Sequence, residues 1–139
     1  MKSLKESFIK AKDLDNISVR ISFEKKDLEL GTIVMFGDKT LGVYVEGSLG
    51  KEMKKIFGFY RAEDKFFIGY DSNTFVSYMD LDDLNDSLIY MSEYNDFSVI
   101  RIYGKKLEEQ EILKFTRDNF YTNINKIVSS IKEYKDREL

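Results

Sequence analysis

Carboxylates and tyrosines are concentrated in the middle third of the chain, residues 61–104. This stretch holds nine acidic side chains against three basic ones, and it contains five of the nine tyrosines of the chain. Its local charge is −6, whereas the segments before and after it carry +2 and +1. Carboxylates in such numbers could bind a divalent cation, serve as a general acid and base, or form a surface that attracts a basic partner.

The densest acidic run, Asp80-Leu81-Asp82-Asp83-Leu84-Asn85-Asp86, has the residue types of a calcium or magnesium site. Its spacing argues against an EF-hand loop, because Leu84 stands at a ligand position, no glycine stands at the bend and the twelfth residue is Met91. Acidic side chains in the first turn of a helix are also stabilised by the helix dipole without any ion. We therefore predict that the chain binds no metal and no cofactor.

The composition excludes several kinds of catalytic chemistry and leaves carboxylates, Lys, Arg, Tyr, Ser and Thr as the side chains that an enzyme could use. The chain has no cysteine and no histidine, which excludes thiol nucleophiles, catalytic triads with histidine and the usual zinc sites. Glu63 and Asp64 fall in a predicted turn, and nothing in the sequence pairs them across a cleft. Gly47, Gly50 and Lys51 lack the spacing of a phosphate-binding loop, and Glu52 follows the lysine. We expect no enzymatic activity.

A small basic group lies in the first half of the chain. Lys51, Lys54 and Lys55 precede aromatic residues at 57, 59 and 60, a combination that could hold a single nucleic acid strand by stacking. The net charge of the chain is −3 and its isoelectric point is near 5.1, whereas nucleic acid binding needs a broad positive face. We predict no binding to nucleic acid.

What remains is a charged docking surface on the acidic segment. Asp83, Asp86 and Tyr90 fall off the apolar helical stripe of this segment, so they are expected to be exposed. Tyrosine is enriched at protein interfaces, and complementary charge speeds encounter and selects partners. The ordinary alternative is a solvated helix face. The predicted partner-binding residues are Asp82, Asp83, Asp86, Tyr90, Glu93, Tyr94 and Asp96.

The overall composition indicates one folded domain. A chain of 139 residues with 42% hydrophobic and 34% charged side chains is of the size and kind that forms a single domain, residues 1–139. It contains no apolar run of the roughly 20 residues that span a membrane, and its N-terminus lacks the pattern of a signal peptide. We expect a cytoplasmic protein that does not bind membranes.

Two hydrophobic periods predict the elements. Three helices are predicted, at 3–14, from Asp80 to about 94 and from about 106 to 135. The apolar stripe of the second helix consists of Leu81, Leu84, Leu88 and Met91. Turns are predicted at 37–39, 62–64 and 71–73, and a loop at 47–51. Alternation of apolar and polar residues predicts strands at 17–23, 28–36, 40–46, 54–60, 65–70, 74–79 and 97–103.

Together these elements predict an α+β fold. We expect a mainly antiparallel meander sheet of six to seven strands, because the connections between the strands are short. An N-terminal helix, a short helix before the last strand and a long C-terminal helix are expected to pack on one face of the sheet.

A small, acidic, aromatic-rich α+β protein without a cofactor is similar in general profile to bacterial immunity proteins. That resemblance implies a non-enzymatic module that neutralises a toxin, often a basic nuclease, by covering its active site or a nearby surface. Two alternatives stay open. The order of seven strands and a C-terminal helix resembles pleckstrin-homology-like domains, in which the Lys51–Lys55 region would meet an anionic headgroup; the size and acidity resemble homodimeric secretion chaperones.

Overall fold

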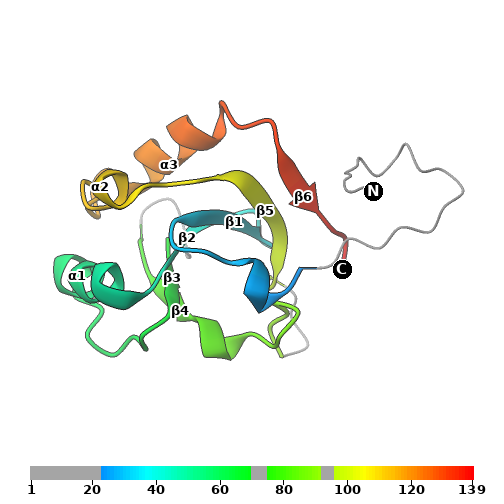
Figure 1. Cartoon of the computed structure of the whole chain (residues 1–139), viewed down its shortest axis with the longest axis horizontal. Helices are drawn as coiled ribbons and strands as arrows, with labels where there is room; N and C mark the ends of the chain where they lie inside the picture. The colour runs from blue at the N-terminus through cyan, green and yellow to red at the C-terminus, as the bar shows by residue number, and fades with distance from the viewer. Residues whose placement is uncertain (1–22, 70–74, 92–95) are drawn as a thin grey trace, which may run out of the picture.

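The computed structural model describes residues 23–69, 75–91 and 96–139. Six strands, three α-helices and two short 3-10 helices (η2 and η3) make up the described part of the chain (Figure 1). In chain order the elements are η2 (Lys25–Asp27), β1 (Thr32–Phe36), β2 (Leu41–Val45), α1 (Gly47–Phe57), β3 (Phe66–Ile68), β4 (Tyr78–Asp80), η3 (Leu81–Asp83), β5 (Val99–Lys106), α2 (Glu109–Ile112), α3 (Phe120–Val128) and β6 (Tyr134–Asp136).

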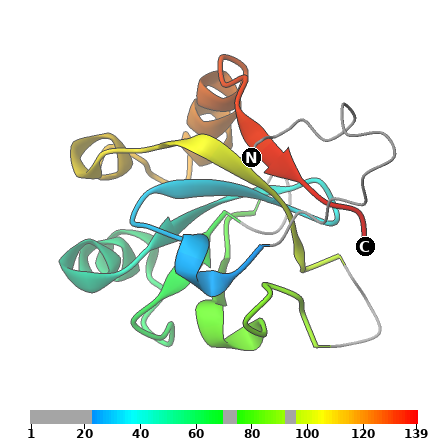
Figure 2. The same cartoon turned by 45° about the vertical axis from the view of Figure 1, so that its right-hand side comes forward.

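The strands form one antiparallel sheet in the order β4-β3-β2-β1-β5-β6. The predicted α+β class with an antiparallel sheet is therefore confirmed. Strands β1 to β4 follow each other across the sheet as a meander, although α1 lies between β2 and β3 in the chain. After β4 the chain crosses to the far side of β1, where β5 pairs with β1 and β6 forms the other edge (Figure 2). The meander is thus four strands long in the described residues, shorter than predicted.

Both faces of the central strands are buried. In β1, Ile33 and Val34 point to opposite sides and neither is exposed to solvent. The first face carries the larger apolar cluster, to which all three α-helices contribute. The second face carries Val34, Phe36, Tyr44 and Phe67, and it is covered by Phe23 and by the segment from Leu81 to Leu88 (Figures 1 and 2). A strand that is apolar on both sides needs a cover on each face, since exposed apolar surface costs about 25 cal/mol per Å².

Helix α1 occupies Gly47–Phe57, so the predicted loop at 47–51 and the predicted strand at 54–60 are wrong. Leu49, Met53 and Phe57 recur every four residues and are fully buried against the sheet. The helix ends at Gly58, which adopts the left-handed conformation with φ of 76°. Gly50 was interpreted as a loop residue, but it allows α1 to lie close to the loop before β3. The aromatic residues near the end of α1 made the local pattern look like a strand.

The long C-terminal helix predicted for 106–135 is also wrong. Strand β5 extends to Lys106, and the following chain forms α2, α3 and the edge strand β6. The side chain of Asn119 accepts the N–H of Thr116 at 2.7 Å, which stabilises a turn between the two helices. After α3, the hydroxyls of Ser129 and Ser130 donate to the carbonyls of Lys126 and Ile127 and end the helical run.

Strand β6 is held at the sheet edge by an arginine that packs on its outer surface. Arg101 on β5 binds Asp136 through both carboxylate oxygens, and its guanidinium lies 3.8 Å from the centre of the Tyr134 ring. The hydrogen bonds with Asp136 raise the pKa of Arg101 above its ordinary value. These contacts are made across 35 residues of chain, so no local pattern could indicate them.

The remaining predicted elements differ in their limits or cannot be compared. The turn at 37–39 joins β1 to β2 as predicted. The strands predicted at 28–36, 40–46, 65–70, 74–79 and 97–103 correspond to β1 to β5, with shifted ends. The helix predicted at 3–14, residues 17–22 of the first predicted strand and the turn at 71–73 lie outside the described residues; Phe23 is described and is not in a strand. A seventh strand is not found in the described residues.

Gly31 provides a test of the close contact between the start of β1 and the end of β5. Its φ is +89°, and a Cβ there would overlap the carbonyl oxygen of Leu107. We expect Gly31→Ala to lower the free energy of unfolding by about 3 kcal/mol or more, since strain at positive φ and overpacking add. Gly58→Ala is the matched control, because Gly58 also has positive φ but no atom within 4 Å of its Cβ position. It should lose only about 1 kcal/mol. Urea unfolding measures both, and equal losses would contradict the steric argument.

Candidate docking surface

The acidic residues Asp82, Asp83 and Asp86 lie on a folded-back segment that covers the second face of the sheet. All three are exposed, whereas Leu81, Leu84 and Leu88 between them are buried. The short helix predicted from Asp80 to about 94 is wrong, since only η3 is helical in the described part of this segment. Leu88 has a φ of +62°, and Leu84 forms a bridge with Tyr90, so the chain turns back on itself. The leucines of the predicted stripe still reach the core, by a different backbone path.

Asn85 organises the turn of this segment. Its side-chain oxygen accepts the N–H groups of Ser87 at 2.9 Å and Ile89 at 3.0 Å. The backbone of Asn85 also pairs with that of Ile89, with 2.9 Å between the N of Asn85 and the carbonyl oxygen of Ile89. Backbone N–H groups outside a helix or sheet need other hydrogen-bond acceptors, and a side-chain oxygen that accepts them stabilises the turn.

Contacts from distant parts of the chain fasten the segment to the fold. The N–H of Lys25 donates to Asp86 O at 2.9 Å, the N–H of Val99 donates to Leu88 O at 3.0 Å, and the N–H of Tyr90 donates to the hydroxyl of Ser98 at 2.8 Å. The acidic side chains are therefore presented on a backbone that is anchored on several sides.

Arg137 completes this anchoring from the C-terminal tail. Its guanidinium donates to Val99 O at 2.9 Å and to Leu88 O at 3.2 Å, and it lies 4.6 Å from the centre of the Phe23 ring. Burial lowers the pKa of Arg137, which is the expected effect of removing a cation from water. Arg137 thus joins the tail, β5, the acidic segment and Phe23.

Burial and neighbouring charges both act on the carboxyl group of Asp80. Burial raises the pKa of Asp80, and the charges of Asp83 and Asp82 raise it further. The N–H of Glu63, which donates to Asp80 Oδ1 at 2.7 Å, and the charge of Lys54 act in the opposite direction. Among the described residues, no ion pair reaches Asp82, Asp83 or Asp86. All three side chains are exposed.

Met91 lies beside these residues and is 73% exposed. The side-chain amide of Asn85 points at its sulfur, with 3.4 Å between Nδ2 and Sδ. Sequence reasoning assigned Met91 to the core because it continues the leucine spacing, and only the reversal of the chain at Leu88 brings it to the surface. We call Asp82, Asp83, Asp86 and Met91 the acidic loop surface.

The other predicted site residues are placed differently. Tyr90 is half-buried, and its ring packs edge-on against Phe97 with 5.0 Å between the ring centres. Asp96 is exposed, but its carbonyl accepts the N–H of Asp38 in the turn between β1 and β2. Asp96 is thus placed beside the turn between β1 and β2. Glu93 and Tyr94 lie outside the described residues.

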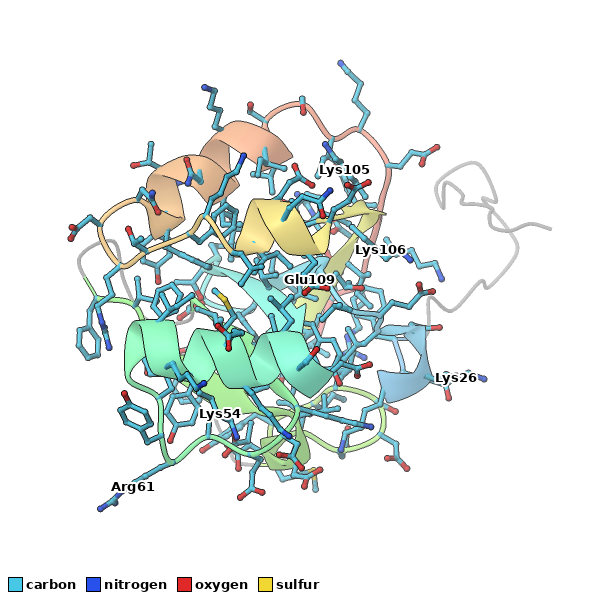
Figure 3. The ribbon with its side chains drawn as sticks, turned by 60° about the vertical axis from the view of Figure 1, so that its left-hand side comes forward. Lys26, Lys54, Arg61, Lys105, Lys106 and Glu109 are labelled. Carbon is cyan, nitrogen blue, oxygen red and sulfur yellow. The ribbon has the colours of Figure 1, made fainter. Side chains whose placement is uncertain are left out.

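The basic group considered in the sequence belongs to α1 (Figure 3). Lys54 pairs with Asp64 at 3.8 Å and Lys55 pairs with Glu52 at 3.7 Å. These lysines are thus partly neutralised by their neighbours.

No group of three or more metal-ligating side chains suited to a metal ion occurs in the described parts of the chain. In the same residues, no helix is both long and apolar enough to cross a membrane. No known protein family, curated protein or solved structure matches the chain.

The raised pKa of Asp80 predicts that replacing this residue changes the stability of the protein in a pH-dependent way. A carboxyl group whose pKa is raised by folding destabilises the fold once ionised, so this cost is present at neutral pH and absent below the unfolded value of about 3.9. Asp80→Asn keeps an oxygen that can accept the Glu63 N–H. We expect it to raise stability at pH 7 by a few tenths of a kcal/mol, because solvent screens the charges, and to have no effect at pH 3. Urea midpoints at both pH values test this, with Asp118→Asn as an exposed control; a lower midpoint at pH 7 would contradict it.

Asn85 predicts how the turn responds to loss of its side-chain acceptor. Asn85→Ala leaves the N–H groups of Ser87 and Ile89 without that partner, and we expect a loss of about 1–2 kcal/mol. Amide hydrogen exchange by NMR should show faster exchange at these two positions. Asn85→Asp retains an acceptor oxygen and should preserve their protection. Similar exchange in both variants would show that the side chain does not organise the turn.

Proposed function

We propose that this protein is a non-enzymatic binding module of the immunity type, which neutralises a basic toxin domain by docking on it through the acidic loop surface. The observation that carries the proposal is the presence of three exposed carboxylates without an ion pair in the described residues, on a loop anchored to the core. Unpaired surface charge of one sign costs stability through repulsion. A basic partner would remove that repulsion.

The anchoring of the loop supports recognition rather than a merely solvated acidic surface. Binding by a flexible segment costs about 0.5–1.5 kcal/mol for each side chain that is immobilised. Here the hydrogen bonds made by Asn85, Ser98 and Arg137 already order the backbone of the loop in the free protein. Much of the entropy cost of ordering that backbone is therefore not incurred on binding. A rigid arrangement of carboxylates also favours the forked guanidinium groups of arginine, which bind carboxylates through two parallel hydrogen bonds.

Met91 supplies the apolar part of the proposed contact. Methionine is flexible and polarisable, so it adapts to the shape of a partner surface. An apolar centre with a charged rim is the common arrangement of protein interfaces. In this proposal the acidic side chains accelerate and orient the encounter, and burial of Met91 slows dissociation. The protein would act in the cytoplasm, on a toxin made in or imported into the same cell.

Charge reversal at the acidic loop surface tests the proposal. The partner to use is a basic toxin domain encoded beside this chain. Its active form serves for inhibition assays, and a catalytically inactive form serves for binding measurements. The triple variant Asp82→Lys, Asp83→Lys, Asp86→Lys should associate at least about tenfold more slowly at low salt, since electrostatic steering raises association rates by 10 to 1,000 times. The difference should shrink as salt shortens the screening length below about 10 Å.

A control variant with the same change in net charge distinguishes the effect of the acidic loop surface from the effect of the overall charge of the protein. Glu109→Lys, Asp118→Lys, Glu138→Lys alters three exposed acids that lie outside the acidic loop surface. This control should bind and inhibit the toxin nearly as well as the unaltered protein. If both triple variants slow association equally, the surface is wrong. If the unaltered protein neither binds nor inhibits such a domain, the proposed function is wrong.

A further inference from the structure

Met91 differs from the other described methionines in its exposure to solvent. Its side chain is 73% exposed, whereas Met53 and Met79 are 0% and 6% exposed and Met35 is half-buried against the first apolar cluster. Oxidation of methionine to its sulfoxide is a common and reversible reaction of proteins. The chain has no cysteine thiol that would compete for the oxidant. Among the described residues, a dissolved oxidant therefore reaches the sulfur of Met91 most easily.

Asn85 directs a hydrogen-bond donor at this sulfur. Its side-chain Nδ2 lies 3.4 Å from Sδ of Met91. The orientation of the amide group is fixed, because its oxygen accepts the N–H groups of Ser87 and Ile89 at 2.9 Å and 3.0 Å. Only the NH2 side of the amide is then left for Met91. The donor is thus held in place by the turn itself, whatever the state of the sulfur.

This donor suits an oxidised sulfur better than the thioether. A thioether sulfur is a weak hydrogen-bond acceptor, whereas a sulfoxide is polar and presents an oxygen. An N–H group donates to an oxygen at about 2.7–3.2 Å. The side chain of methionine has three rotatable bonds, so rotation about Cγ–Sδ brings such an oxygen to Nδ2 of Asn85. The turn therefore contains a preformed partner for the sulfoxide of Met91.

We propose that Met91 is a reversible oxidation site, at which hydrogen peroxide forms a methionine sulfoxide that Asn85 binds through its side-chain amide. A lone pair of Sδ attacks one oxygen of the peroxide, so that an S–O bond forms and the O–O bond breaks. The second oxygen leaves as hydroxide and takes up the proton of the transferred hydroxyl group, which gives water. The sulfur loses two electrons and the peroxide gains them.

The position of Met91 outside the core allows this reaction to be reversed in the folded protein. A sulfoxide in a core disrupts the packing, but Leu84 and Leu88 fill the core here and Met91 does not. Two thiols of a methionine sulfoxide reductase remove the oxygen as water and become a disulfide, which restores the thioether. Such an enzyme needs access to the side chain, and the exposure of Met91 provides it.

This inference does not depend on the proposed function, because it concerns the chemistry of the free protein. One consequence alone rests on that function. A sulfoxide would introduce a polar group into the apolar part of the proposed contact, so the oxidised protein would dissociate faster from its partner. The experiments below use the free protein, so their outcome is independent of whether a toxin is bound.

Peroxide treatment of the folded full chain tests where the oxygen is added. We expect Met91 to be oxidised at least about tenfold faster than Met53 and Met79, because the core encloses the sulfurs of those two residues. Peptide mass spectrometry measures the oxidation of each methionine, and the same treatment in urea should make the three rates nearly equal. A methionine sulfoxide reductase with a dithiol should then restore the original mass. Equal rates in the folded protein, or a sulfoxide at Met91 that the reductase does not remove, would overturn the proposal.

NMR tests whether Asn85 binds the oxidised side chain. We expect oxidation to shift the side-chain NH2 resonances of Asn85 and to slow amide exchange at Ser87 and Ile89 by at least about twofold, because a stronger acceptor fixes the amide group. Asn85→Asp keeps an acceptor for these two N–H groups but replaces the donor by an oxygen, so oxidation should not slow their exchange.

Met91→Leu is the matched control for the sulfur. Peroxide should leave the resonances of Asn85 unchanged in this variant, because leucine has the bulk of methionine but cannot be oxidised. Resonances of Asn85 that do not respond to oxidation in the unaltered chain overturn the proposal. It is also overturned by a shift that persists in Met91→Leu, or by slower exchange on oxidation of Asn85→Asp.

Discussion

Burial of both faces of the central strands is the constraint on which the rest of this fold depends. Strands β1 and β2 have apolar side chains on either side, so neither face can be left in water. The three α-helices cover the first face. The second face is covered without any α-helix among the described residues, by Phe23 and by the leucines of the acidic segment. The same segment must therefore be apolar inward and carry its acidic residues outward.

This arrangement gives the acidic segment two roles at once. Its leucines close the second core, so its backbone cannot move freely without exposing apolar surface. Its carboxylates project from that fixed backbone. Burial is the main cause of the raised pKa of Asp80, and the charges of Asp83 and Asp82 add to it, which is an electrostatic cost of keeping these carboxylates together. A surface that is held in place despite such a cost is better suited to binding than a solvated loop would be.

Three arginines connect parts of the chain that are distant in sequence. Arg101 binds the edge strand through Asp136, Arg117 binds the ends of α1 and of the β4 segment, and Arg137 binds the acidic segment to the tail. Two of these three donate to backbone carbonyls rather than to carboxylates. Carbonyl groups at the ends of short elements need donors, and a guanidinium with five N–H groups can supply several at once. Short helices and strands of three residues are thereby held without long regular elements.

The amino-acid sequence determined the class of the fold and the hairpin between β1 and β2, because alternation and turn residues act within a few positions. It also identified Leu81, Leu84 and Leu88 as buried and the aspartates between them as a charged surface. Sequence reasoning failed where periodicity was ambiguous: residues 54–60 fit both a strand and the last turns of a helix, and residues 106–135 lacked a visible break. Only the tertiary structure decided these cases, because burial against the sheet selects the helical spacing of Leu49, Met53 and Phe57. In the same way, the local hydrogen bonds of Asn85 and the long-range contacts of Arg117 and Arg137 hold short, folded-back segments in place of the predicted helices. The reversal of the chain also brings Met91 to the surface.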